Sequence, residues 1–270
     1  MDKRKELINH FYDGYREDGR LSASRHGQLE YLTTMYYIHK LLPNCSEIME
    51  VGAGTGRYSV ALAKEGYTVT ALELADKNFE ILEQNSAGIS NLTIRKGDAV
   101  ELGEFQNEIF DATLILGPMY HLYEAVERKK ALSETVRVTK PGGIIMAAFL
   151  SVHAIMYDNY LKGNVRAGIE ENFTENYQVK HFAEQMFTGY NVDEFEMQFN
   201  DFPVIHIATV AADGVLELAE GRTDFRMTDK DFSDFAEYHL KNCERRELLG
   251  SSSHLLYIGR KADIRREQKR

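Results

Sequence analysis

The sequence predicts an α/β fold in which a mostly parallel sheet is covered on both faces by helices. Between residues 46 and 150, short apolar runs of strand character alternate with segments of helical periodicity, as in folds built from repeated strand–helix units. A glycine-rich turn directly follows the first of these strands, at the place where such sheets bind ligands. The composition, 43% hydrophobic and 27% charged, is that of a folded globular protein.

The first 45 residues are expected to form an N-terminal helical segment. Its apolar side chains recur at three- and four-residue spacing, which is typical of one face of a helix: Leu29, Leu32, Met35, Tyr36, Ile38 and Leu42. The pair Pro43-Asn44 ends this pattern, because proline cannot continue a helix.

Residues 46–150 are expected to form the first half of the sheet. Strands are predicted at 47–51, 67–72, 92–96, 110–116 and 144–150, and helices at 58–65, 76–85 and 122–139. One side of the last helix is expected to carry Leu122, Ala125, Val126, Leu132 and Val136. The run Pro141-Gly142-Gly143 is interpreted as a turn before the final strand of this half.

The rhythm changes after residue 150. Residues 151–200 are rich in Tyr, Phe, Asn and Glu, show no clear strand, and are interpreted as a mostly helical insertion. Residues 201–260 are expected to complete the sheet with strands at 204–210 and 254–259. Between them, Thr228 and Asp231 resemble a capping box that starts a helix. Residues 261–270 form a charged tail that is expected to fray.

Composition also restricts function and location. The net charge of −10 disfavours a nucleic-acid partner, because an acidic surface repels phosphates. The two cysteines, Cys45 and Cys243, suit a reducing compartment and are too few for a cysteine-rich zinc site, so no metal is expected. The longest apolar run, residues 144–150, is far shorter than the ~20 residues that span a bilayer. We therefore expect a cytoplasmic protein, as a monomer or homodimer, without a membrane partner.

The glycine loop at residues 50–56 is the central motif. Gly52, Gly54 and Gly56 allow a tight turn and a close approach of the backbone to a ligand. In the dinucleotide-binding fingerprint the third glycine follows the second by three positions, but here that position is Arg57. A loop that cradles a pyrophosphate is therefore disfavoured. The acidic Glu50 just before the loop favours a functional loop over a plain turn.

Acidic residues follow the second and third strands. Glu73 ends the second strand at about the distance from the loop expected for a carboxylate that binds ribose hydroxyls. Asp98 follows the third strand and could accept a hydrogen bond from an adenine amino group, with the backbone of Ala99 at the ring edge. The alternatives are a surface glutamate at a strand end and a turn aspartate that caps a helix.

With these pieces in order, the sequence resembles the class I S-adenosylmethionine-dependent methyltransferases. The resemblance covers roughly residues 45–150 and rests on the loop Glu-Val-Gly-Ala-Gly-Thr-Gly at 50–56, on Glu73 and Asp98, on the fourth-strand segment 110–117, and on Lys-Pro-Gly-Gly at 140–143. It implies a Rossmann-like sheet of seven strands with an antiparallel last strand. It also implies S-adenosyl-L-methionine as cofactor and S-adenosyl-L-homocysteine as product.

The same resemblance implies the cofactor-binding residues. They would be Glu50, Gly52, Ala53, Gly54, Gly56, Glu73, Asp98, Ala99 and Gly117. By analogy, residues 1–45 would cap the cofactor and 151–200 would cover the active site. Arg25 could then meet the methionine carboxylate, although a solvated position fits it equally well. A bacterial subgroup of small-molecule methyltransferases with unassigned substrates is also similar, through residues 24–28, 117–122 and 243–250 with His254.

Methyl transfer from a sulfonium is an in-line displacement, so the enzyme mainly aligns the two reactants and excludes water. A hydroxyl or ammonium acceptor also needs a base. His121, just after the fourth strand, is the candidate base, and packing against the next helix is its alternative. Tyr120 and, more weakly, His153 are expected to line the substrate pocket. If alignment alone suffices, no base is needed.

These observations predict methyl transfer to a small-molecule acceptor. DNA amino-methyltransferases carry an amide or acid before Pro-Pro at the fourth strand, whereas this chain has Gly117-Pro118-Met119-Tyr120. Cytosine-carbon methyltransferases need a cysteine after proline, and neither cysteine follows one. The early third glycine disfavours an NAD oxidoreductase. A methyltransferase acting on tRNA or protein, and a non-catalytic protein that binds the same cofactor, remain the alternatives.

Overall fold

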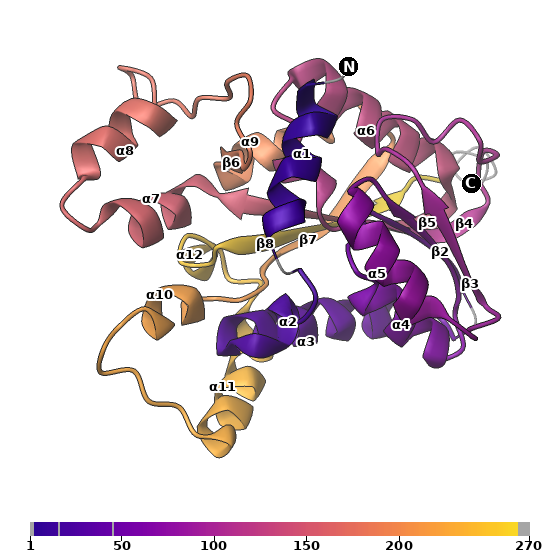
Figure 1. Cartoon of the computed structure of the whole chain (residues 1–270), viewed down its shortest axis with the longest axis horizontal. Coiled ribbons are helices and arrows are strands. Elements are labelled where there is room, and N and C mark those ends of the chain that lie inside the picture. The colour runs from indigo at the N-terminus through magenta and orange to yellow at the C-terminus, as the bar shows by residue number, and fades with distance from the viewer. Residues whose placement is uncertain (1–2, 16, 45, 264–270) are drawn as a thin grey trace.

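The computed structural model describes residues 3–15, 17–44 and 46–263, and it has the predicted α/β architecture around one sheet (Figure 1). The main path of the sheet runs β3-β2-β1-β4-β5-β8-β7. Its strands are β1 (Glu47–Val51), β2 (Thr68–Glu73), β3 (Leu92–Lys96), β4 (Phe110–Ile115), β5 (Thr139–Ser151), β7 (Val204–Ala211) and β8 (His254–Lys261). Strands β1 to β5 are parallel, and β8 inserts antiparallel between β5 and β7. The expected seven-stranded path with an antiparallel last strand is therefore confirmed.

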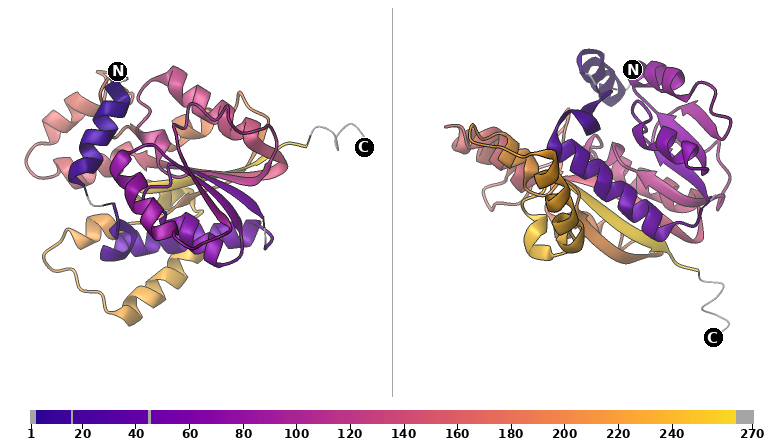
Figure 2. Two further views of the ribbon diagram at one scale, coloured as in Figure 1. Left: turned by 45° about the vertical axis from the view of Figure 1, so that its right-hand side comes forward. Right: turned by 90° about the horizontal axis from the view of Figure 1, so that it is seen from below.

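Helices cover both faces of the sheet. They are α1 (Lys3–Gly14), α2 (Arg20–Ala23), α3 (Arg25–Leu41), α4 (Arg57–Lys64), α5 (Asp76–Ser86), α6 (Ala125–Val138), α7 (Val152–Tyr160), α8 (Val165–Asn172), α9 (Val192–Met197), α10 (Leu216–Glu220), α11 (Asp229–Asn242) and α12 (Arg246–Leu249), with a 3₁₀ turn η1 (Pro118–Tyr120). The strand order changes direction between β1 and β4, and parallel strands joined through a helix are generally connected in a right-handed sense. Helix α6 therefore lies on the opposite face from α3 and α4 (Figures 1 and 2).

The N-terminal segment is broken into three helices rather than one. Gly19 adopts a left-handed φ of +94° before α2, and the Ser24 side chain caps α3 by accepting from the Gly27 N–H. Leu29 and Ile38 are fully buried, whereas Leu32 is 41% exposed, so the predicted apolar stripe is narrower than the sequence spacing indicates. Cys45 lies outside the described residues.

The segment after β5 is less helical than expected. Helices α7, α8 and α9 are present, but residues 173–188 form a loop that is closed by a β-bridge between Phe173 and Val179. A two-residue strand, β6 (Gly189–Tyr190), pairs with the end of β5 and was not predicted. The backbone N–H of Thr188 donates to the carbonyl of Tyr120, which ties this loop to the turn after β4.

Two further local predictions are corrected. The Pro141-Gly142-Gly143 turn lies within β5 as an irregularity: Thr139 pairs with Phe110, and pairing resumes only at Ile144. Helix α6 begins at Ala125, so Leu122 precedes it, and Val126 points to solvent at 79% exposure. The capping box at Thr228 is confirmed.

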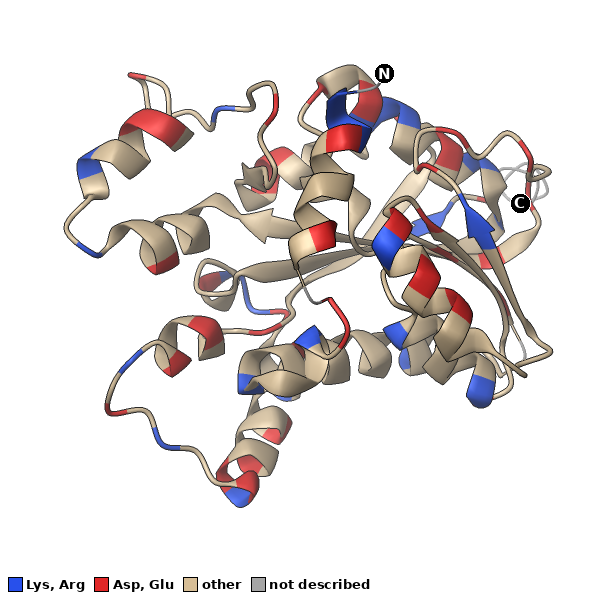
Figure 3. Ribbon diagram, in the orientation of Figure 1, with Lys and Arg blue, Asp and Glu red and all other residues tan. Residues whose placement is uncertain are grey.

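Acidic and basic residues alternate over the elements in the view of Figure 3. Among the described residues, no helix is both long and apolar enough to cross a membrane. In the charged tail, residues 264–270 lie outside the described part of the chain, and Lys261 still belongs to β8.

Candidate active site

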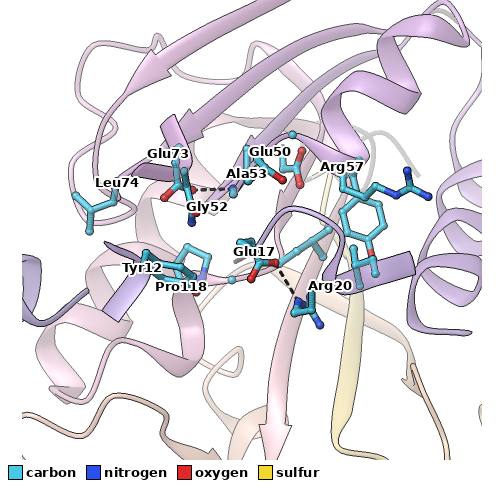
Figure 4. Close-up of a pocket in the computed structure, with 18 of the residues that line it drawn as sticks. Tyr12, Glu17, Arg20, Glu50, Gly52, Ala53, Arg57, Glu73, Leu74 and Pro118 are labelled. Atoms are coloured by element: carbon cyan, nitrogen blue, oxygen red, sulfur yellow. Dashed lines mark hydrogen bonds and ion pairs between the residues drawn. The ribbon is translucent and has the colours of Figure 1, made fainter. Parts of the chain in front are cut away.

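A cavity of about 630 Å³ lies at the carboxyl ends of β1, β2 and β4. This is the switch point of the sheet, where the strand order reverses and α/β proteins bind ligands. Figure 4 shows its two walls: Glu73, Gly52 and Ala53 on one side, and Tyr12, Glu17 and Arg20 on the other. The volume suits one small ligand of nucleoside size.

The glycine loop forms the floor through backbone geometry. Gly52, Gly54 and Gly56 all have left-handed φ values, of +73°, +57° and +89°. A Cβ on Gly52 would lie 2.6 Å from the Pro118 ring, so the loop passes closely against the turn after β4. Only glycine tolerates both the conformation and the contact.

The amides of this loop are already occupied. The N–H groups of Gly52 and Ala53 donate to the Leu72 carbonyl, and the N–H of Gly54 donates to Glu73 Oε2 at 2.7 Å. A pyrophosphate cradle needs such donors free and no carboxylate beside them. The loop therefore fits a cofactor without phosphates, as the position of the third glycine predicts.

Two buried carboxyl groups flank the loop. Glu73 accepts from Gly54 N–H through one oxygen and from Ala75 N–H through the other, and burial raises its pKa to about 7. Glu50 accepts from the Ser59 hydroxyl, and burial raises its pKa to about 8. Acidic groups without a cationic partner of their own suit a positively charged ligand, and both side chains line the cavity.

Asp98, just after β3, also lines the cavity, and helix α1 reaches it through Arg4. Arg4 Nη2 donates to Asp98 Oδ2 at 2.6 Å, and both side chains are 3% exposed. Burial raises the pKa of Asp98, but the hydrogen bond and charge of Arg4 outweigh it and the net shift is downward. The other oxygen, Oδ1, accepts only a long 3.3 Å contact from Val100 N–H. It keeps the capacity to accept from a ligand, with Ala99 adjoining it in the cavity wall.

The turn after β4 supplies Gly117, Tyr120 and His121, and all three line the cavity. His121 Nδ1 lies 2.8 Å from the carbonyl of Met186, so it must donate there. The other nitrogen, Nε2, therefore accepts from the Tyr12 hydroxyl at 3.1 Å. Burial lowers the pKa of His121 to about 4, so the ring is neutral at physiological pH.

Arg25 and His153 lie away from this cavity. Arg25 forms an ion pair with Asp229 at 2.5 Å, which joins α3 to α11. His153 hydrogen-bonds Asn191 at 3.0 Å on an exposed part of α7. Three other arginines line the cavity: Arg4, Arg57 and Arg20, the last of them five residues before Arg25.

A second cavity of about 600 Å³ adjoins the first, and the two share Tyr12, Glu17, Arg20 and Tyr120 as lining residues. Its remaining wall comes from α1, the start of α3, the end of β5, α7, α8, α10, the loop before β6 and the start of β8. The sequence analysis did not single out Tyr12, Glu17 or Arg20. The aromatic residues near position 12 were the available signal.

A buried ion network holds Arg20 at this junction. Arg20 donates to both oxygens of Glu30, at 2.7 and 3.0 Å, and lowers the pKa of Glu30 to about 2 against the effect of burial. His254 donates to Asp213. Burial lowers the pKa of His254, but the effect of Glu30 and Asp213 is larger and opposite, so the pKa is raised to about 9. Two cations thus balance two carboxylates.

Comparison with known proteins agrees with this geometry. Residues 49–147 match a family model described as a methyltransferase domain. A demethylmenaquinone methyltransferase of Clavibacter sepedonicus is 34% identical over 120 residues, which are 43% of this chain and 47% of that protein. The chain thus spans about half the length of the curated relatives it matches.

Solved structures show the same fold over most of the chain. A SAM-dependent methyltransferase of Methanosarcina mazei aligns with a TM-score of 0.55 at 18% identity, over 84% of this chain and 97% of that one. The 1,6-didemethyltoxoflavin-N1-methyltransferase of Burkholderia thailandensis, solved with its substrate and S-adenosylhomocysteine, aligns with a TM-score of 0.55 at 13% identity, over 97% and 88%.

Fold and site together place a cavity of nucleoside size at the switch point of a Rossmann-like sheet. Residues 49–147 thus match a methyltransferase domain, and the fold of the chain is that of solved S-adenosylmethionine-dependent methyltransferases. The cavity fits this cofactor: Glu73 would hold the ribose, Asp98 the adenine, and the acidic loop region the charged methionyl part.

Proposed function

We propose that the protein transfers a methyl group from S-adenosyl-L-methionine to a small molecule held in the second cavity. The observation that carries this proposal is the pair of adjoining cavities, which share one boundary at Tyr12, Glu17, Arg20 and Tyr120. One cavity offers the acceptors a nucleoside needs, and the other is large enough for a small molecule. The Clavibacter relative and the toxoflavin enzyme, each named for a small-molecule acceptor, support the same class.

Bound cofactor supplies an already activated methyl group, so the chain's own residues have to align the acceptor, exclude water and place its departing proton. The cap segments 1–45 and 151–200 serve the second task in this proposal, since both contribute to the wall of the second cavity. The two-cysteine composition and the acidic net charge support a cytoplasmic enzyme that acts on neither membrane nor nucleic acid, as a monomer or homodimer.

We assign His121 a positioning role through Tyr12. Both ring nitrogens of His121 are occupied within the protein, and a pKa of about 4 makes the ring a weak proton acceptor. Tyr12, in contrast, lines both cavities, and its hydroxyl is oriented by His121. The Tyr12 oxygen is then the group that meets the acceptor. His121 as a direct base is the competing mechanism.

Cofactor binding tests the function, and variants of His121 test the mechanism. Calorimetry should show S-adenosylhomocysteine binding in the micromolar range or tighter, roughly −8 kcal/mol, and no comparable binding of NAD. His121→Gln can still donate to Met186 and accept from Tyr12. With an acceptor in hand it should keep most of the kcat that His121→Ala loses. A loss of ~10²-fold or more in His121→Gln as well, together with loss of the acid limb of the pH profile, would establish His121 as the base.

A further inference from the structure

Some of the charged side chains that line the second cavity have a partner of opposite charge, and others do not. Its basic side chains each have a carboxylate partner: Arg20 has Glu30, His254 has Asp213, and His26 has Glu220. Three of its acidic side chains also have a donor, since Glu17 pairs with Arg20, Glu184 pairs with Lys3, and Glu171 accepts from Tyr160.

Like Glu171, Asp158 on α7 and Glu217 on α10 have no cationic partner among the described residues. In the ranges that the structure describes, neither carboxylate forms an ion pair, and Asp158 accepts only the Ser253 hydroxyl, at 3.1 Å. Burial raises the pKa of Asp158, and the negative charge of Glu217 raises it further. The negative charge of Glu217 thus acts on Asp158, and His26, whose ring pairs with Glu220, offsets part of this effect.

An independent feature also indicates that a hydrogen-bond donor binds in this cavity. Gln185, in the loop before β6, is 7% exposed, and its Oε1 has no hydrogen-bond partner among the described residues. It lines the second cavity. A buried acceptor without a donor destabilises the ligand-free protein, and a bound N–H group would remove this cost.

The rest of the wall is largely aromatic, with the rings of Phe11, Tyr12, Tyr15, Tyr120, Tyr160 and Phe187. Aromatic faces carry negative potential and attract cations, besides packing against apolar groups. Unpaired carboxylates, an unpaired amide oxygen and aromatic rings thus combine in one chamber.

We infer that this chamber takes a methyl acceptor that carries a protonated amine, with Asp158 and Glu217 as the anchor for that amine. The inference rests on the proposed function and specifies its substrate class. Both carboxylates line only the second cavity, whereas the boundary with the cofactor cavity is formed by other residues. The anchored ammonium is therefore distinct from the atom that receives the methyl group, which lies at the Tyr12 end of the molecule.

Matched probes on the full chain saturated with S-adenosylhomocysteine test this. The probes share a phenyl ring and differ in charge: 2-phenylethylamine, 2-phenylethanol and phenylacetate. We expect calorimetry to show the amine binding at least tenfold more tightly than the alcohol, and the anion most weakly. Equal or stronger binding of the alcohol or the anion overturns the inference while leaving cofactor binding, and so the proposed function, intact. If the chain does not bind S-adenosylhomocysteine, the proposed function itself is wrong.

Variants locate the effect. Asp158→Asn with Glu217→Gln should remove the preference for the amine and leave both alcohol and S-adenosylhomocysteine affinity unchanged. Asp234→Asn with Glu237→Gln removes the same charge from the exposed face of α11 and should keep the preference. Gln185→Leu should raise the melting temperature of the ligand-free protein and weaken binding of 2-phenylethylamine. An amine preference that survives the first pair, or is lost in the control pair, refutes the assignment.

Discussion

Replacing Glu73 by glutamine separates its two roles, binding ribose and supporting the glycine loop. The carboxylate accepts 2.7 Å hydrogen bonds from Gly54 N–H and Ala75 N–H. In Glu73→Gln one oxygen becomes an amide nitrogen that cannot accept, and the negative charge offered to the ribose hydroxyls is lost. Losing one charge-assisted bond costs about 1.5–3 kcal/mol, which corresponds to roughly 12- to 150-fold weaker binding.

Calorimetry with S-adenosylhomocysteine measures this loss, and a thermal melt reports the state of the fold. Glu80→Gln, the same change on the exposed face of α5, is the control and should bind like the wild type. Glu73→Ala is a blunter change, because it leaves two backbone donors without an acceptor and should also lower stability. If folded Glu73→Gln binds S-adenosylhomocysteine with wild-type affinity, the carboxylate only supports the loop and the ribose assignment is wrong.

Three further perturbations test the site. Gly52→Ala forces a φ of +73° on alanine and sets a Cβ 2.6 Å from the facing proline ring, so we expect a loss of at least ~1–2 kcal/mol and a lower melting temperature; an unchanged melt contradicts the loop geometry. Arg4→Met breaks the buried pair with Asp98 and should speed hydrogen exchange across residues 3–14, whereas Lys3→Met, at an exposed pair, should not. The pKa of Glu50 is raised from 4.5 to about 8, so the ligand-free fold should lose stability as pH rises from about 5 through 8. In Glu50→Gln the melting temperature should depend less on pH over this range. An equally steep dependence in the variant refutes the assignment.

The cofactor half was predictable because its signals are local. Gly52 and Glu73 each follow a strand of the parallel sheet, and parallel strands end at one edge, so sequence order alone indicates that the two side chains meet. The capping box at Thr228 and the strands of the second half are local in the same sense. Their patterns need no knowledge of distant contacts.

The acceptor side depends on contacts between distant parts of the chain. Tyr12 meets His121 across 109 residues of sequence, and no periodicity marks such a pair. Arg20 begins α2 and Arg25 begins α3, and the extended residue Ser24 breaks the chain between them. Arg20 enters the cavity, while Arg25 pairs with Asp229. The choice between them rests on long-range packing and is not visible in composition or spacing.

The contacts of helix α1 have a consequence for the timing of turnover. Its first turn is held through Arg4 to Asp98, and its last turn through Tyr12 to His121. Because Arg4, Ile8 and Tyr12 of α1 line the cofactor cavity, we expect both ends of the helix to detach before a nucleoside leaves it, and detaching the first exposes a buried ion pair to water. Loop and helix motions of this kind take microseconds to milliseconds or longer and often limit turnover. Product release, rather than methyl transfer, would then limit the rate of turnover. The first turnover after mixing would be faster than every later one.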